Sequence, residues 1–153
     1  MVYWRGALGA LGVDRRMKPM EPPAGRQVFG QAFAPVAGDF DENGHVNNVV
    51  YLRWVQEMAT AHWRSRAPEE AQAKWTWVVL RHEIDYRRPL LPGETAQART
   101  WVGARSGPRF VRYVRIDGPD GEVCAQAASE WCLLDIATRR PTRVPDALVE
   151  MFS

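Results

Sequence analysis

The chain has 153 residues, which is enough for one domain with a sizeable core. Apolar residues make up 46% and charged residues 25%, as in ordinary globular domains, and the net charge of +2 is too small to indicate a nucleic-acid partner. No apolar run reaches the length of a membrane span, so we expect no membrane partner.

The first 26 residues differ in composition from the rest of the chain. An apolar run at 7–13 is short, is broken by glycines and is not followed by a small-residue cleavage site, which argues against a signal peptide. Prolines are frequent from residue 19 to residue 23. We therefore expect residues 1–26 to form an arm and a Pro-rich linker, and residues 27–153 to form the domain.

The domain shows one long helical pattern, which lies between a first strand pattern and four later ones. Strand patterns cover 27–33, 75–86, 95–102, 110–116 and 122–134; helical patterns cover 48–66 and, more briefly, 67–70 and 145–151. The first turns of the 48–66 helix are apolar on almost every side, as expected for a buried helix. One long helix and five strands, four of them joined by short links, predict an α+β architecture with an antiparallel sheet.

Two of the strands carry further information. In 75–86, strict alternation would place Thr76 and Tyr86 on one face and Trp75 and Trp77 on the other. In 122–134, small residues at every second position would let a large helix lie close to the sheet. Segment 105–108 is expected to be a loop.

A polar turn precedes the long helix. Asp39, Asp41, Asn43 and His45 alternate along it, and Asn43-Gly44 is a strong turn signal. Asn47 or Asn48 is a natural N-cap for the helix. The pattern therefore delivers a carboxylate and an imidazole to the positive end of a buried helix, while Asp39 is expected to be a solvated or turn residue.

The motif Asp-x-Asp-x-Asn-x-His-Val-Asn-Asn, followed by two residues and Tyr51, resembles the signature of hotdog-fold acyl-CoA and acyl-carrier-protein thioesterases, chiefly the 4-hydroxybenzoyl-CoA thioesterase type. The resemblance is dense from Asp39 to Tyr51 and looser to about Leu134. It implies a hotdog fold, in which a five-stranded antiparallel sheet wraps one long central helix. It also implies active sites formed between two subunits of a homodimer or a dimer of dimers.

Thioester hydrolysis needs few catalytic groups, because the thiol leaves readily at its pKa of roughly 8.5. Asp41 has the spacing to Gly44 and to the helix that carries the catalytic carboxylate in the hydroxybenzoyl-CoA relatives, which implies a nucleophile or a general base. Its structural alternative is to order the Asn-Gly turn. The backbone N–H groups of Asn48 and Val49 are expected to polarise the thioester carbonyl.

Asn43 and His45 match an Asn and a His that are proposed catalytic residues in the plant carrier-protein enzymes. His45 could instead be structural. The chain departs from the plant pattern after Tyr86-Arg87-Arg88, where Pro89-Leu90 replaces a Glu-Cys pair. We therefore expect no cysteine nucleophile.

The two cysteines are expected to be structural. Cys124 and Cys132 fall on one strand, which cannot fold back to join them, so we expect two core thiols in a reducing cytoplasm. No pair of residues has metal-ligand spacing, and we expect neither metal nor cofactor.

Tyr51 and Trp54 could line an acyl channel or be plain core. The arginines available for carrier phosphates are Arg81, Arg87, Arg88, Arg105, Arg109 and Arg112, of which Arg87 and Arg88 are the candidates.

The sequence thus predicts an acyl-CoA or acyl-carrier-protein thioesterase that releases a free acid and a thiol. Two alternatives stay open. A hotdog hydratase or dehydratase would have Pro after the Asn and a longer gap to the His, where this chain has Gly44-His45. A dimeric acyl-CoA-binding module without turnover would have no need for Asp41 at the helix start.

Overall fold

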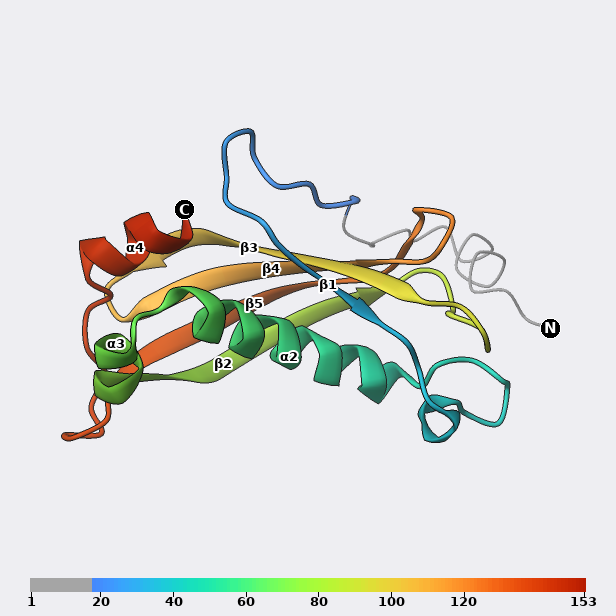
Figure 1. The fold of residues 1–153 in the computed structure, drawn as a ribbon, viewed down its shortest axis with the longest axis horizontal. Helices are drawn as coiled ribbons and strands as arrows, with labels where there is room; N and C mark the ends of the chain where they lie inside the picture. Colours follow the sequence, from blue (N-terminus) through green and yellow to red (C-terminus); the bar gives the residue numbers. More distant parts are fainter. Residues whose placement is uncertain (1–17) are drawn as a thin grey trace.

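The computed structural model describes residues 18–153, and it shows one antiparallel sheet with a long helix lying across one face (Figure 1). In chain order the elements are β1 Phe29–Phe33, the 3-10 turn η1 Ala37–Asp39, α2 Asn48–Arg66, α3 Glu69–Lys74, β2 Trp75–Tyr86, β3 Ala96–Ser106, β4 Arg109–Asp117, β5 Val123–Asp135 and α4 Asp146–Phe152. The five strands run in the order β1-β3-β4-β5-β2. The hotdog architecture that the resemblance implied is confirmed.

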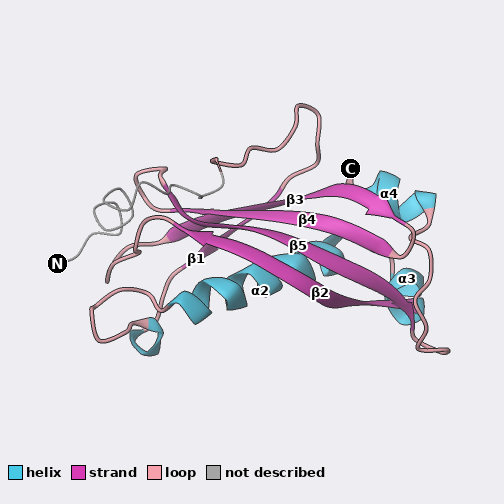
Figure 2. Ribbon diagram, turned by 180° about the vertical axis from the view of Figure 1, so that it is seen from behind, coloured by secondary structure: helices cyan, strands magenta, loops and turns pink. Residues whose placement is uncertain are grey.

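The view from behind shows the sheet in front and α2 beyond it, so the helix covers a single face (Figure 2). The predicted strands are all present, with one clear difference in length. Ser106 pairs with Arg109, so the segment expected to be a loop is a two-residue hairpin turn. Gly107 supplies the positive φ of 57° that such a tight turn needs.

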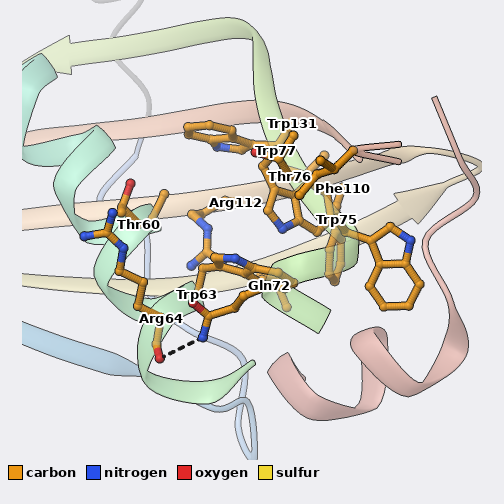
Figure 3. Close-up of a pocket in the computed structure, with 14 residues that line it drawn as sticks. Thr60, Trp63, Arg64, Gln72, Trp75, Thr76, Trp77, Phe110, Arg112 and Trp131 are labelled. Atoms are coloured by element: carbon orange, nitrogen blue, oxygen red, sulfur yellow. Dashed lines mark hydrogen bonds between the residues drawn. The ribbon is translucent and has the colours of Figure 1, made fainter. Parts of the chain in front are cut away.

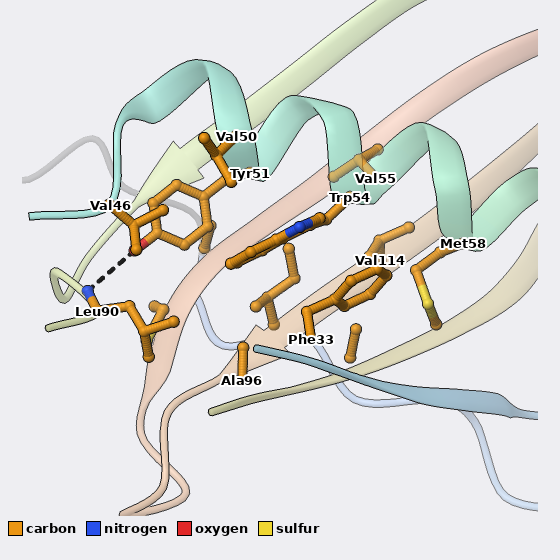
Figure 4. Close-up of a cluster of buried hydrophobic side chains, with 14 of the residues drawn as sticks. Phe33, Val46, Val50, Tyr51, Trp54, Val55, Met58, Leu90, Ala96 and Val114 are labelled. Carbon is orange, nitrogen blue, oxygen red and sulfur yellow. Dashed lines mark hydrogen bonds between the residues drawn. The ribbon is translucent and has the colours of Figure 1, made fainter. Parts of the chain in front are cut away.

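The core lies between α2 and the sheet (Figure 4). Trp54, Val55 and Met58 of α2 are at most 2% exposed. Ala125 and Ala127 of β5 are fully buried in the same cluster, which confirms the expected small-residue face. A side chain larger than a methyl group at either alanine would push the helix away from the sheet.

The predicted alternation along β2 is wrong in one respect. A bulge between Val79 and Arg81 shifts the register against β5, so the two halves of the strand show opposite faces to the helix. Trp77 packs against Trp63 of α2 before the bulge, and Ile84 joins the helix-facing core after it. Strict period two cannot anticipate an inserted residue.

The described part of the predicted arm is not free. Lys18 and Met20 bond through their backbones to the buried side chain of Gln126 on β5. Glu21 pairs with Arg115 and, at 3.4 Å, with Arg99. Residues 18–21 therefore dock on the sheet face opposite α2, whereas residues 1–17 lie outside the described part of the chain.

This docking surface contains a buried charge network. Arg115 is 9% exposed and donates to Asp117 at 2.7 Å and to the backbone oxygen of Met20 at 3.2 Å. Asp117 is 8% exposed and has Arg99 as a second, more distant partner at 3.4 Å.

Among helices of residues 18–153, none combines the length and apolar character of a membrane span.

We expect Arg115→Met to lower the free energy of unfolding by about 2–4 kcal/mol, because it leaves the Asp117 carboxylate buried with only a weak partner. Urea denaturation followed by circular dichroism measures the change. Arg109→Met on the same strand is the matched control, since Arg109 is largely exposed and pairs only with Glu130 among the described residues. The control is expected to change stability by less than about 1 kcal/mol. Equal losses in the two variants would contradict the role given to the network.

Candidate active site

The polar turn before α2 forms a closed loop. Phe40 and Val46 face each other as an isolated antiparallel bridge, and the Asp41 N–H donates to the His45 carbonyl at 2.8 Å. Gly44 has a φ of 72°, a conformation that favours glycine, and its N–H donates to the Asp41 carbonyl at 3.0 Å. The Val46 N–H ties the loop to the Leu90 carbonyl at 3.0 Å. The predicted turn is confirmed.

Asp41 orders this loop with one of its two carboxylate oxygens. Oδ1 accepts the N–H of Asn43 at 2.8 Å and that of His45 at 3.2 Å. Among residues 18–153, no hydrogen-bond donor reaches Oδ2. The structural role considered for Asp41 is therefore present, and it leaves a second oxygen open to solvent and to the pocket described below.

The start of α2 is capped by Asn47, whose Oδ1 accepts the Val49 N–H at 3.1 Å. The Val50 N–H bonds to the Asn47 carbonyl at 2.9 Å. The N–H of Asn48 has no acceptor in the described part of the chain. Of the two N–H groups predicted to polarise a carbonyl, Asn48 is thus available, whereas the cap already occupies Val49.

Asp39 is a buried turn residue, so the solvated alternative is wrong. It is 5% exposed, accepts the Val36 N–H at 3.0 Å and pairs with Arg53 of α2 at 3.0 Å. The Val36 N–H and the Arg53 guanidinium outweigh burial and lower the pKa of Asp39. Arg53 also reaches Glu57 at 3.5 Å, on the solvated side of the helix. Asp39 therefore attaches the loop to the first turns of α2.

A pocket of about 170 Å³ opens beside the loop. It is lined by Asp41, Asn43, His45, Val46, Asn47, Asn48, Tyr51, Tyr86, Arg87, Arg88, Pro89 and Cys124. Seven of the nine predicted site residues meet there. The other two do not line it: Val49 lies on the exposed surface, and Trp54 is 2% exposed within the core.

Three residues of the lining have contacts that limit what they can do. The Tyr51 hydroxyl accepts the Leu90 N–H at 3.0 Å, and burial raises the pKa of Tyr51, which stays protonated (Figure 4). Arg88 forms a bidentate pair with Glu94, each bond being 2.9 Å, and this pair raises the pKa of Arg88. Arg87 has Asp85 among its partners, with an Nε to Oδ2 distance of 3.4 Å.

Cys124 is a pocket residue that the sequence pattern did not indicate. A register shift between Ile116 and Asp117 makes room for it as the extra residue of β5, and its carbonyl accepts the N–H groups of Arg87 and Arg88. The thiol is 1% exposed, and burial raises its pKa to about 11. A protonated, buried thiol is a poor nucleophile, which agrees with the prediction that Cys124 is a core residue.

The pocket thus combines one open carboxylate oxygen, one free helix N–H and two arginines. Among residues 18–153, no group of three or more His, Cys, Asp or Glu side chains is placed to hold a metal ion. The arrangement can activate a nucleophile beside a polarised carbonyl and can hold negative charge at its rim.

Comparisons with known proteins point the same way. The family model described as the thioesterase-like superfamily matches residues 35–152. A palmitoyl-acyl carrier protein thioesterase from Cuphea hookeriana is 32% identical over 130 residues, which are 78% of this chain and 31% of that protein. The chain therefore spans less than a third of this plant relative.

Solved structures share the fold at low sequence identity. A Staphylococcus aureus protein in complex with CoA superposes with a TM-score of 0.74 at 16% identity and covers 82% of each chain. A Thermus thermophilus thioesterase complexed with coenzyme A and Zn gives a TM-score of 0.72 at 24% identity, covering 84% of this chain and 93% of that one.

We expect Asp39→Asn to lower the free energy of unfolding at pH 7 by about 2 kcal/mol, because it weakens hydrogen bonds that a charged acceptor makes strong. The folded-state pKa of Asp39 is below its ordinary value of 3.8, so this stabilisation is present above pH 3.8 and is lost as the pH falls through the folded-state pKa. Denaturation at pH 7 and at about pH 3 measures both parts. Glu57→Gln, which loses only an exposed contact with the same Arg53, is the control. A difference that persists unchanged at low pH would contradict the assignment.

Proposed function

We propose that this chain, which belongs to the thioesterase-like superfamily, hydrolyses acyl thioesters of CoA or of an acyl carrier protein to a free acid and a thiol. The observation that carries the proposal is that Asp41, with its open Oδ2, and Asn48, whose N–H has no acceptor among residues 18–153, line the same pocket at the start of α2. A thioester needs little more than a carboxylate and an oxyanion donor, because its thiol leaves without strong acid assistance.

Asp41 acts in one of two ways in this proposal. As a general base, Oδ2 takes a proton from water while the hydroxide oxygen bonds to the acyl carbon, and collapse of the tetrahedral intermediate expels the thiolate. As a nucleophile, Oδ2 itself bonds to the acyl carbon and expels the thiolate, and water then hydrolyses the anhydride. In both cases the two N–H bonds to Oδ1 hold the carboxylate in one orientation.

Negative charge develops on the carbonyl oxygen in either route. The Asn48 N–H and the positive end of α2 supply its stabilisation. The Val49 N–H contributes only as a donor shared with the Asn47 side chain. Asn43 and His45 have side chains on the same pocket and are proposed to orient the water or the thioester carbonyl.

The pantetheine carrier approaches from the β2 side of the pocket. Arg87 and Arg88 line that side and are the proposed partners for a carrier phosphate, and Arg88 also pairs with Glu94 and Asp120. The named relative acts on an acyl carrier protein and two structural neighbours hold CoA, which supports both carrier types for this chain.

The two alternative functions make different products. A hydratase or dehydratase of the same fold would leave the thioester intact, and a binding module would turn nothing over. A thiol-release assay against a panel of acyl-CoAs of different chain length separates them, because only hydrolysis frees the thiol.

We further propose that the protein is a cytoplasmic homodimer or dimer of dimers. β2 is an edge strand of twelve residues, and Val78 and Leu80 on it are 38% and 51% exposed. Long apolar edges favour pairing with a second copy.

A reducing compartment suits the two buried thiols, Cys124 and Cys132, which form no disulfide with each other.

We expect Asp41→Asn to lower kcat by about a hundredfold or more while CoA binding stays near the wild-type value, because the neutral amide neither attacks the thioester nor accepts a proton from water. The amide oxygen can still accept the two loop N–H bonds, so the fold should survive. Thiol release gives kcat, calorimetry gives the Kd for CoA, and circular dichroism checks folding. Glu42→Gln, a neutral substitution of an exposed carboxylate in the same loop, is the control and should keep full turnover. Near wild-type turnover in folded Asp41→Asn would show that Asp41 only orders the turn.

We expect light scattering at micromolar concentration to give at least twice the 17.4 kDa mass of one chain. Leu80→Lys should shift this protein toward the monomer, because a charged side chain on an edge strand opposes pairing. Val49→Lys, at an exposed site on α2, is the matched control. A wild-type mass of 17.4 kDa would refute the proposed oligomer.

A further inference from the structure

A second cavity, larger than the pocket at the catalytic loop, lies elsewhere in the described chain. It measures about 270 Å³ and lies beside the C-terminal half of α2, between this helix, α3, β2 and β4 (Figure 3). Aromatic rings form a large part of its walls and come from Trp63, Trp75, Trp77, Phe110 and Trp131. Figure 3 shows the Arg112 side chain in the middle of these residues. The cavity thus places a cation beside aromatic rings.

Within residues 18–153, Arg112 makes its side-chain hydrogen bonds through one nitrogen, Nη1. Nη1 meets His62 Nδ1 at 2.9 Å and Thr100 Oγ1 at 3.1 Å. Because a guanidinium can only donate, Nδ1 of His62 must accept, so Nε2 carries the proton and donates to Gln27 Oε1 at 3.2 Å. His62 is therefore neutral, and burial together with Arg112 lowers its pKa to about 3.

Within the described range, the positive charge of Arg112 has no counter-ion. No carboxylate among residues 18–153 pairs with it, and no Asp or Glu of this range lines the cavity. Burial lowers the pKa of Arg112 to about 10, so the group is still charged at pH 7. A second cation, Arg64, stands at the cavity rim. Arg112 is half-buried, and holding an unpaired charge there costs free energy that an anion in the cavity would offset.

We propose that this cavity binds a small carboxylate with an aromatic or short aliphatic body. The Nε and Nη2 donors of Arg112 have no acceptor in the described part of the chain, and together they form the guanidinium edge that accommodates a carboxylate with two parallel hydrogen bonds. The aromatic walls fit an apolar body. The volume is just below that of sites for drug-sized ligands, which indicates a compact molecule.

This site is distinct from the catalytic pocket. The two cavities share no residue and lie toward opposite ends of α2. Thr60 lies twelve positions after Asn48 in α2, a helical rise of about 18 Å. The core around Trp54 and Met58, which is at most 2% exposed, fills the space between. The ligand is thus a free acid, and its binding does not depend on the proposed hydrolysis, although a carboxylate is also what hydrolysis would release.

Benzoate and its uncharged analogue benzamide test the proposal directly. Calorimetry and the fluorescence of the wall tryptophans measure binding to the full chain. We expect benzoate to bind at least about tenfold more tightly than benzamide, and Arg112→Gln to abolish this preference. Arg109→Gln removes an arginine from the same strand but not from the cavity, so this control should keep the preference.

A second variant covers the case in which Arg112→Gln does not fold. Thr60→Trp places a large side chain at an exposed position of the lining and leaves Arg112 unchanged, so it should weaken benzoate binding by about tenfold or more. Circular dichroism checks each variant. Equal affinity of the wild type for benzoate and benzamide, or wild-type benzoate affinity in either folded variant, would overturn the proposal and leave Arg112 as a structural partner of His62.

Discussion

The close packing of α2 on the sheet is the constraint on which the rest of the structure depends. It is possible because Ala125 and Ala127 of β5 are fully buried and leave room for Trp54 and Met58 of the helix. The apolar side chains of α2 pack on the sheet from the first turn of the helix onward. This fixes its first turn next to the polar loop and its last turns beside the aromatic cavity.

In the loop before α2, the Asp41 side chain has both a structural role and a proposed catalytic role. Oδ1 of Asp41 satisfies two backbone N–H groups, and Oδ2 remains open to the pocket. Asp39 fixes the loop to α2 through Arg53, so Asp41 does not have to hold the loop alone. A reactive carboxylate needs this kind of support, because a small error in its orientation lowers the rate of attack.

The charges of the arginines on the two faces of the sheet are balanced to different degrees. On the outer face, Arg115 is held by Asp117 and by residues 20 and 21 of the docked arm, and its charge is fully compensated. On the inner face, the partners of Arg112 among residues 18–153 are the neutral His62 and Thr100. A compensated charge contributes to the fold, whereas an uncompensated one in a cavity is suited to an external anion.

The sequence by itself determined the fold class, the limits of α2 and the loop that carries Asp41, because these follow from local periodicity, turn residues and a dense motif. The tertiary structure decided the rest. It showed that Asn47 occupies the Val49 N–H, that a bulge turns Trp77 toward the helix, and that another places Cys124 in the pocket. It also placed Arg112 beside His62, fifty residues away in the chain. Such contacts depend on register and on packing between distant segments, which residue spacing does not encode.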